Sequence, residues 1–284
     1  MSTLLEVPVK TWARATQAPS PPRAPSPEVI RALEAPLVEK ARRSSRLRYM
    51  PSPNFRWDAR DYFVPHFVFN GPPSGGDFLR LGLFGAIHGD EPEGAWSLIA
   101  LLETLLENPA LATGYQLHVY PVCNPTGFAQ KRRTSSSGVD LNRAFWKDST
   151  IPEVWWLEHE LITRRFHGLV SLHSDDTAEG AYAYVRGPVF SETLARPALT
   201  AAARFLPHDT RNVIDGFQAR NGLVQECFEG VLSAPPSELE PTPFEIIFET
   251  PQTAPAGLQV QAGQHALLAI LEAYRGFLGY QAGI

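Results

Sequence analysis

His88 and Glu91 stand three residues apart at the end of an apolar run, in the segment LGLFGAIHGDEPE. The run over 79–87 is typical of a buried strand, and apolar residues at helical spacing follow from Pro92. Asp90 is the expected N-cap of that helix. An imidazole and a carboxylate that converge at a strand end are two of the three protein ligands of an open zinc site. The pattern is short, and it also fits a surface corner whose charges only cap the helix.

A third candidate ligand, His173, ends a second short β-rich run, LVSLH. Between the two runs lies the polar cluster DLNR (140–143), which follows a Ser- and Gly-rich loop. In open α/β sheets, ligands bind beyond the carboxyl ends of the strands. We therefore expect His88 and His173 to face one crevice.

HxxE, then DLNR, then a strand-terminal histidine resembles the zinc metallocarboxypeptidase family, in its bacterial branch near murein peptide amidases and the succinylglutamate desuccinylase/aspartoacylase group. The likeness is clearest in HGDEPEG and NPTGFAQKRRTSSSGVDLNRAF, and it runs to about Pro251. It implies one Zn²⁺ per chain, held by His88, Glu91 and His173. Three protein ligands leave room for a water, whose pKa the metal lowers to about 7. The implied reaction is attack of this metal-activated water on an amide carbonyl beside a free carboxylate.

The resemblance also implies roles for the arginines between these motifs. Arg133 would stabilise the developing oxyanion, with Arg132 as the adjacent alternative. Asn142 and Arg143 match the pair that grips the carboxylate of the substrate, because the planar guanidinium binds a carboxylate bidentately. The alternative for Arg143 is an ion pair with Asp140 on the same loop.

A substrate pocket is implied by the segment FQARNGLV, 217–224. The family has a mobile tyrosine where this chain has Phe217, which cannot donate a hydrogen bond, so closure over the substrate must differ. Val224 is then expected at the floor of the pocket for the leaving residue. Gln225 and 175–176 (Asp-Asp) are candidates for polar contacts, for example with a second amino group on the substrate.

The general base is expected on the strand PFEIIFETP, where Glu245 and Glu249 share one face. They lie about 13 Å apart, at about 3.3 Å per residue, so only one can reach the metal. If this strand runs parallel to those that end at His88 and His173, Glu249 is the nearer. Bacterial members of the family also resemble FETP here. Glu245 is then a solvated or salt-bridged carboxylate.

The alternation of strands and helices predicts a three-layer α/β/α sandwich around a mixed, mostly parallel twisted sheet. Strands are expected over 61–69, 78–87, 116–122, 168–173, 180–186 and 244–250, and helices over 27–48, 92–107, 152–166, within 189–205 and over 257–278. Residues 1–55 are expected to form a Pro-rich arm and a helix packed on the core. Residues 56–284 are expected to form a single catalytic domain.

The composition limits the kinds of partner and the location that we expect for this protein. A net charge of −5 over 284 residues gives no basic footprint for nucleic acid. Two cysteines make no disulfide framework. No apolar run is long enough for a signal peptide or a membrane span, so we expect a cytoplasmic protein. The expected partner is a peptide or acyl-amino-acid substrate with a free carboxylate.

Two other functions compete with a carboxypeptidase or peptide amidase. N-acyl amino acid amidohydrolases such as succinylglutamate desuccinylase and aspartoacylase share HxxE and DLNR, but they carry a β-rich C-terminal domain for which 250–284 is too short. A silent zinc-binding module would lack a ligand or the base, and this sequence has both. The other six histidines, His66 and His118 among them, have no partner at ligand spacing and are expected to be structural or surface residues.

Overall fold

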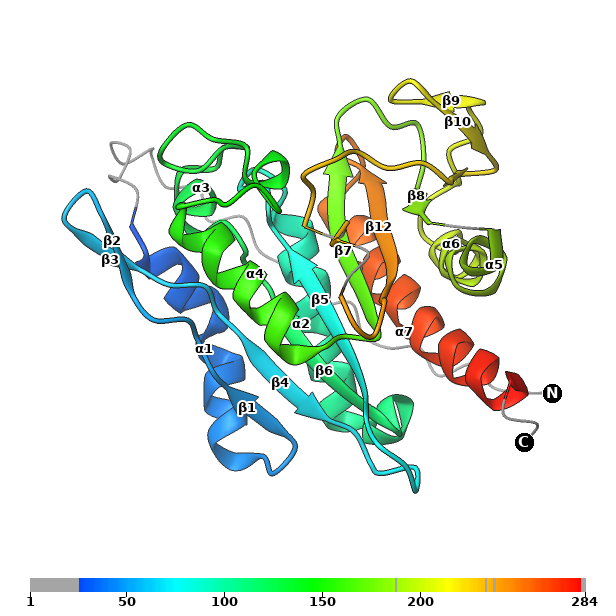
Figure 1. Cartoon of the computed structure of the whole chain (residues 1–284), viewed down its shortest axis with the longest axis horizontal. Coiled ribbons are helices and arrows are strands. Elements are labelled where there is room, and N and C mark those ends of the chain that lie inside the picture. The colour runs from blue at the N-terminus through cyan, green and yellow to red at the C-terminus, as the bar shows by residue number, and fades with distance from the viewer. Residues whose placement is uncertain (1–25, 187, 233, 237–238, 282–284) are drawn as a thin grey trace.

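The computed structural model describes residues 26–186, 188–232, 234–236 and 239–281, so the predicted arm falls mostly outside the described residues. Its centre is a ten-stranded sheet in the order β1-β4-β6-β5-β7-β12-β8-β11-β10-β9, with a separate hairpin β2-β3 (Figure 1). The strands are β1 Leu47–Tyr49, β2 Phe55–Trp57, β3 Arg60–Tyr62, β4 Phe67–Asn70, β5 Leu79–Gly85, β6 Tyr115–Tyr120, β7 Gly168–Asp175, β8 Tyr182–Val185, β9 Val213–Ile214, β10 Phe217–Arg220, β11 Leu223–Val224 and β12 Phe244–Pro251. The helices are α1 Glu28–Arg43, α2 Pro92–Glu107, η1 Pro109–Ala112, α3 Pro125–Gln130, η2 Leu141–Arg143, α4 Pro152–Arg164, α5 Pro188–Phe190, η3 Ser191–Ala195, α6 Arg196–Ala202 and α7 Ala256–Gln281.

The predicted mixed α/β sheet is confirmed, with a central parallel group of β6, β5, β7 and β12 and a further parallel pair, β8 and β11. On either side of this group, β4 pairs antiparallel with β6, and β8 pairs antiparallel with β12. The carboxyl ends of the four central strands therefore meet at one edge of the sheet. The expected direction of the FETP strand is confirmed, because β12 runs parallel to β7 with Glu249 opposite His173.

Helices cover both faces of the sheet and bury a separate apolar cluster on each. The larger cluster packs the sheet against α1, α2, α6 and α7. The second packs the opposite face against α4, through Val154, Leu157 and Leu161. No helix among the described residues is both long and apolar enough to cross a membrane.

Several short elements were not predicted. The helix expected over 27–48 ends at Arg43, and the chain then forms β1, which pairs with β4. The loop expected before Arg143 contains α3, whose first turn is capped by the side chain of Asn124. The expectation that Asp90 caps α2 is wrong: Glu91 holds the N-cap position and makes no side-chain cap hydrogen bond. Three- and six-residue elements carry too few residues for a periodic pattern to identify them.

The start of α2 lies unusually close to β7. A Cβ added at Gly94 would come within 2.8 Å of the carbonyl oxygen of Leu172, the residue before His173. Only glycine permits this approach, so the first turn of α2 and the end of β7 are held at a fixed separation.

We expect Gly94→Ala to destabilise the fold by about 1–3 kcal/mol, because the added methyl group must push backbone apart. Gly276→Ala is the matched control, since a Cβ at Gly276 in α7 meets nothing within 4 Å. That change should be neutral or stabilise by roughly 0.5–1 kcal/mol. Thermal unfolding of both variants checks this, and equal melting temperatures would contradict the close approach.

Candidate metal centre

His88, Glu91 and His173 converge at the carboxyl edge of the parallel strands. Glu91 bridges the two imidazoles: its Oε1 lies 2.6 Å from His88 Nδ1, and its Oε2 lies 2.9 Å from His173 Nδ1. All three side chains are buried, and their donor atoms lie within 4.8 Å of one another. Two imidazoles and a carboxylate that share one point are the donor set of an open zinc site. The residues present therefore fit the expected metal.

The backbone after β5 brings His88 and Glu91 to this point. Ala86 has a φ of 44°, which turns the chain away from the strand direction. Gly89 lies against α3 so closely that a Cβ would come within 2.1 Å of the carbonyl carbon of Gly127. Pro92 then starts α2 at a position where its missing N–H costs nothing. The corner between β5 and α2 is therefore fixed by both neighbouring elements.

The ionisation states of His88, Glu91 and His173 depend on one another. Burial alone would raise the pKa of the Glu91 carboxyl, but His173 and His88 outweigh it and lower that pKa to about 2. Burial likewise opposes a charged His88, yet the hydrogen bonds that its imidazole donates to Asp140 and Glu91 leave its pKa above the ordinary value. For His173, burial prevails and the pKa is lowered. The ionised form of the Glu91 carboxyl is therefore favoured despite burial, and Arg133 approaches it at 3.6 Å.

Asp140 ties the metal ligands to the predicted oxyanion residue. Its Oδ1 lies 3.2 Å from His88 Nε2, and its Oδ2 accepts hydrogen bonds at 3.1 Å from the guanidinium of Arg133. A carboxylate on the outer nitrogen of a histidine ligand fixes the ring orientation. The alternative partner considered for this carboxylate, Arg143, is not in ion-pair contact with it. The DLNR motif pointed to Asp140, but the sequence did not predict that this residue would join His88 to Arg133.

Asn124 is a second residue that the sequence did not single out. Its side chain is completely buried and donates to the backbone carbonyls of Ile87, at 3.2 Å, and Arg133, at 3.3 Å. It also accepts from the backbone N–H of Gly127 at 2.8 Å. One amide therefore joins the residue before His88 to the loop that carries Arg133. Its place at the head of NPTGF was the only sequence signal.

The predicted carboxylate-binding pair lies at the same cavity. Asn142 is buried, and its Oδ1 accepts from the backbone N–H of Leu232 at 2.9 Å. The Arg143 guanidinium lies 4.5 Å from the ring centroid of Phe228 and donates to the carbonyl of Asn142 at 2.8 Å. No described acidic side chain pairs with Arg143. Its positive charge is therefore available to an anionic ligand.

The two glutamates of β12 lie in different surroundings. Glu249 lines the cavity, where burial and the nearby carboxylates of Glu91 and Asp175 raise its pKa well above the ordinary value. Glu245 lies outside this cavity and pairs with Arg186 at 3.3 Å. Burial raises the pKa of Glu245 to about 7. Glu249 thus lies at the end of the strand where the ligands converge.

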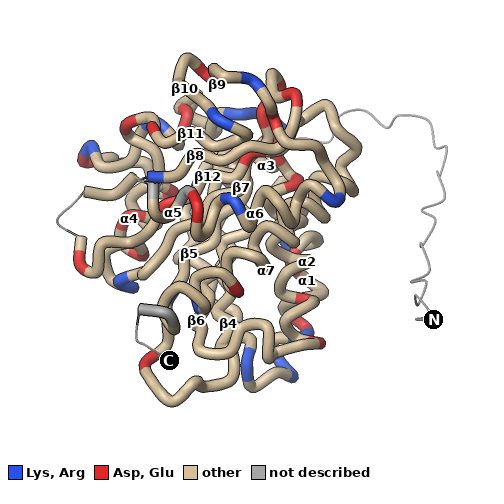
Figure 2. Tube along the Cα trace, turned by 90° about the vertical axis from the view of Figure 1, so that its right-hand side faces the viewer, with Lys and Arg blue, Asp and Glu red and all other residues tan. Residues whose placement is uncertain are grey.

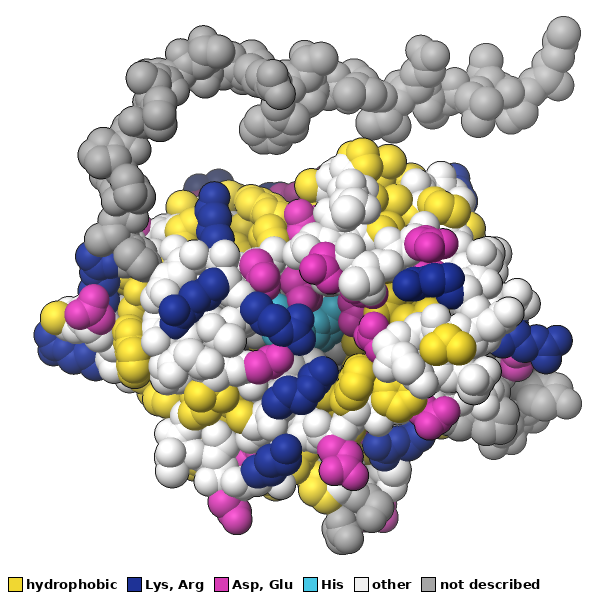
Figure 3. Space-filling model, turned by 90° about the horizontal axis from the view of Figure 1, so that it is seen from above, with side chains coloured by type: hydrophobic (Ala, Val, Ile, Leu, Met, Phe, Trp, Pro, Cys, Tyr) yellow, Lys and Arg dark blue, Asp and Glu magenta, His cyan; other side chains and the backbone are white. Residues whose placement is uncertain are grey.

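A cavity of about 180 Å³ joins these residues. Figure 3 shows it from above, with histidines at its floor and with arginines and carboxylates around them. Of the predicted site residues, His88, Glu91, Arg133, Asn142, Arg143, His173 and Glu249 line it. Phe217 and Val224 do not: Val224 is completely buried in the core, and Phe217 packs behind Phe228 with ring centroids 4.9 Å apart. Tyr182, Tyr184 and Asp215 line it and were not predicted.

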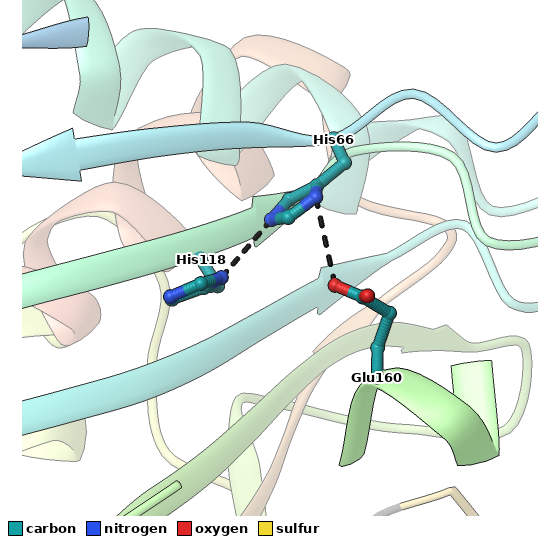
Figure 4. Close-up of side chains that lie close together, drawn as sticks. All are labelled: His66, His118 and Glu160. Atoms are coloured by element: carbon teal, nitrogen blue, oxygen red, sulfur yellow. Dashed lines mark hydrogen bonds and ion pairs between the residues drawn. The ribbon is translucent and has the colours of Figure 1, made fainter. Parts of the chain in front are cut away.

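A second buried group, His66, His118 and Glu160, has the same residue types (Figure 4). His66 Nε2 lies 3.1 Å from His118 Nδ1, and His66 Nδ1 lies 3.7 Å from Glu160 Oε2. However, Arg164 donates to both oxygens of Glu160 at 3.0 Å, and Tyr120 donates to Oε2 at 2.9 Å. The carboxylate is therefore already paired. Burial lowers the pKa of both histidines, which keeps them neutral.

Comparison with known proteins supports the resemblance. Residues 77–208 match the model of the succinylglutamate desuccinylase/aspartoacylase catalytic domain, which confirms the expected likeness to that group. Carboxypeptidase SOL1 of Arabidopsis thaliana is 35% identical over 68 residues, a match that spans 22% of this chain and 14% of that protein. Both matches cover only segments of the chain. The match to the domain model includes His88, Glu91 and His173 and ends before Glu249.

Solved structures show the same fold. A putative metallopeptidase from Shewanella denitrificans superposes with a TM-score of 0.69 at 22% identity, covering 86% of this chain and 90% of the other. A metallo-carboxypeptidase from Burkholderia cenocepacia gives 0.64 at 17%, covering 88% and 69%. A Pseudomonas aeruginosa metallo-carboxypeptidase in complex with (2-guanidinoethylmercapto)succinic acid gives 0.61 at 17%, covering 85% and 68%. These likenesses show that the chain has a carboxypeptidase-like fold.

The elevated pKa of Glu249 predicts a cost in stability. In the unfolded chain this carboxyl ionises near its ordinary pKa, whereas in the fold ionisation is disfavoured, so the penalty grows as pH rises and is complete above the folded-state pKa. We expect Glu249→Gln to stabilise the chelator-treated protein at pH 8 by at least about 1 kcal/mol, and less at pH 5. The exposed Glu107→Gln is the control, with little change at either pH. A Glu249→Gln variant less stable at pH 8 than the parent would contradict the prediction.

Proposed function

We propose that the protein is a zinc-dependent hydrolase that cleaves an amide bond next to a free carboxylate, as a metallocarboxypeptidase or peptide amidase. The observation that carries this is one cavity lined by a histidine–glutamate–histidine group, a buried carboxylate and two arginines. Zinc, when bound, supplies a water with a pKa near 7 and polarises a carbonyl. His88, Glu91 and His173 would hold it.

Glu249 is assigned as the general base. Its carboxyl group lines the cavity opposite His173 on the neighbouring strand, where a carboxylate can accept a proton and later give it to the leaving amine. Arg133 is assigned to the developing oxyanion, where a fixed cation in a partly desolvated site stabilises negative charge. Its ion pairs with Asp140, at 3.1 Å, and with Glu91, at 3.6 Å, hold the guanidinium in place.

Arg143, together with Asn142, is assigned to the free carboxylate of the substrate. The guanidinium packs over Phe228, which orients its plane and leaves its remaining donors for a bidentate contact. An internal peptide bond offers no carboxylate at this position. The enzyme would therefore remove a terminal residue rather than cut within a chain.

One zinc per chain is part of the proposal. The second group at His66 has its carboxylate occupied by Arg164 and Tyr120, so an ion there would first have to break a buried ion pair. We assign that group to packing of α4 on the sheet.

An N-acyl amino acid amidohydrolase is the second candidate, favoured by the match of residues 77–208 to the succinylglutamate desuccinylase/aspartoacylase domain. The same residues would serve that reaction, since an N-acyl amino acid also has a carboxylate next to its amide. The two functions differ in the acyl side, which is a peptide in one case and a small acid in the other.

Metal binding and base function are separable by mutation. His173→Ala should lose zinc and activity together. Glu249→Gln should keep zinc and lower kcat by a factor of roughly 10² or more, while Glu245→Gln changes kcat little. Elemental analysis and rate measurements on each variant test this, and His66→Ala is the control expected to retain one zinc. Full zinc content in His173→Ala would refute the ligand assignment.

Substrate class is tested with the zinc-loaded protein and paired peptides. Peptides with a free C-terminus should be cleaved, and the same peptides with an amidated C-terminus should not, because Arg143 then has no anionic partner. N-succinyl and N-acetyl amino acids in the same screen test the second candidate. Arg143→Ala should lower kcat/KM for free-acid peptides by about 10² or more. Equal cleavage of free and amidated peptides by the parent would rule out carboxylate recognition.

A further inference from the structure

Arg133 is held at its two ends by different parts of the protein. Its guanidinium contacts Asp140 at 3.1 Å and Glu91 at 3.6 Å, although 47% of the side chain is exposed. Its backbone carbonyl accepts a hydrogen bond at 3.3 Å from the side-chain amide of Asn124, the N-cap residue of α3. In Figure 2, α3 lies at the same end of the molecule as β7 and the acidic residues gathered there. The backbone position of Arg133 therefore depends on α3.

The Asn124 side chain connects the loop that carries Arg133 to the corner that carries the candidate metal ligands. Its Nδ2 donates to the carbonyl of Arg133 and, at 3.2 Å, to the carbonyl of Ile87, the residue before His88. Its Oδ1 accepts from the backbone N–H of Gly127 at 2.8 Å, which fixes the orientation of the amide. A completely buried amide with these partners cannot move without leaving a polar group unpaired. The two carbonyls are therefore kept at a constant separation.

Thr126 holds the same loop at a second point, three residues beyond Arg133. Its hydroxyl accepts from the backbone N–H of Ser136 at 3.1 Å and donates to the carboxyl group of Glu153 at 3.1 Å. Thr126 and Glu153 are both buried, and Glu153 belongs to α4. This contact therefore joins the loop to a second helix. Asn124 and Thr126 together fix the loop at Arg133 itself and shortly after it.

The loop has little apolar packing that could hold it instead. Between Lys131 and Asp140, only Ser135 is buried. Lys131 turns the chain out of α3 with a φ of 53°. An exposed segment with few buried contacts opens easily unless hydrogen bonds restrain it. A cation that stabilises an oxyanion must already be in place when the charge develops, so these hydrogen bonds bear on the rate of the reaction.

We propose, on the basis of the proposed function, that Asn124 and Thr126 are positioning residues, which set where the Arg133 guanidinium stands relative to the carbonyl of the substrate. Neither side chain lines the cavity, so both act through the loop. A displacement of about 1 Å at a group that binds the transition state can cost roughly 10² in rate. The loss should appear in kcat, because Arg133 acts as negative charge develops and Arg143 grips the carboxylate in the ground state as well.

The first test compares three variants of the zinc-loaded protein. Asn124→Asp keeps an oxygen for the N–H of Gly127 and loses the two donated hydrogen bonds, and Thr126→Val removes the hydroxyl at nearly constant volume. Each should lower kcat by about tenfold or more and change KM by less than about threefold. Ser52→Ala is the control, since its buried hydroxyl accepts from the N–H of Val64 outside the cavity, and it should keep kcat. Parental kcat in either loop variant would overturn the assignment of that residue.

A double-mutant cycle shows whether the loss passes through Arg133. Arg133→Ala should by itself lower kcat by roughly 10² or more. Adding Asn124→Asp or Thr126→Val to it should cost less than about twofold further, because the group that they position is already absent. General damage to the fold predicts losses that add in full. Additive losses in both double variants would overturn the proposal.

A measurement without turnover separates this inference from the proposed function. The Nε–H of Arg133 donates to Asp140 at 3.1 Å, and its signal in a heteronuclear NMR spectrum is the one absent from Arg133→Ala. At mildly acidic pH, where such protons exchange slowly, that signal should shift or broaden in Asn124→Asp and Thr126→Val and stay unchanged in Ser52→Ala.

The two measurements give distinguishable outcomes. If no amide is cleaved yet the Arg133 signal responds in this way, the proposed reaction fails and the positioning stands. If peptides are cleaved and the signal is unchanged in both loop variants, the reaction stands and the inference fails. If Asn124→Asp does not fold, Thr126→Val decides the matter by both kcat and the Arg133 signal.

Discussion

The structure depends on one buried anion. Glu91 is placed between two imidazoles, and its charge interactions and hydrogen bonds with them lower its pKa to about 2 despite burial that acts in the other direction. A carboxylate held charged in the interior must be compensated, and here the compensation comes from elements far apart in sequence, β7 and the corner after β5. The close approach at Gly94 keeps those elements at a constant separation.

The parallel centre of the sheet explains why the site is at this edge. Four adjacent strands with the same direction deliver their carboxyl ends together, so residues 88, 173 and 249 meet although they are distant in the chain. Segments outside this centre contribute side chains to the wall of the cavity. β8 contributes Tyr182 and Tyr184 to one wall of the cavity, and the β9–β10 turn contributes Asp215. The proposed metal ligands and base thus lie at the ends of the central strands, and the rest of the wall comes from the flanking segments.

The sequence predicted the central strands and the converging residues because long apolar runs and motif spacing are local signals. It also predicted which glutamate of β12 lies at the cavity, since strand alternation and direction were enough. It did not reveal the β9–β10 hairpin or Asp215, because strands of two and four residues are too short to show a periodic pattern and an Asp-Gly turn is common at surfaces. Val224 illustrates the opposite error. A motif aligned it with a pocket floor, but pairing of β11 with β8 puts it in the core. Motifs transfer best where backbone geometry is fixed, and least on irregular flanks.

Asp140 contacts both His88 and Arg133. The order of the surface loop that carries Arg133 is therefore linked to the order of the buried candidate metal centre. The segment Lys131-Arg132-Arg133 offers three consecutive bonds that trypsin favours, and half of the Arg133 side chain is in solvent, at 47% exposure. Asp140 and the Asn124 amide restrain that segment through the same contacts that orient His88 and the residue before it. Loss of order at His88 therefore loosens the restraint on the loop. The rate at which a protease cleaves this loop therefore reports whether the candidate metal centre is correctly formed.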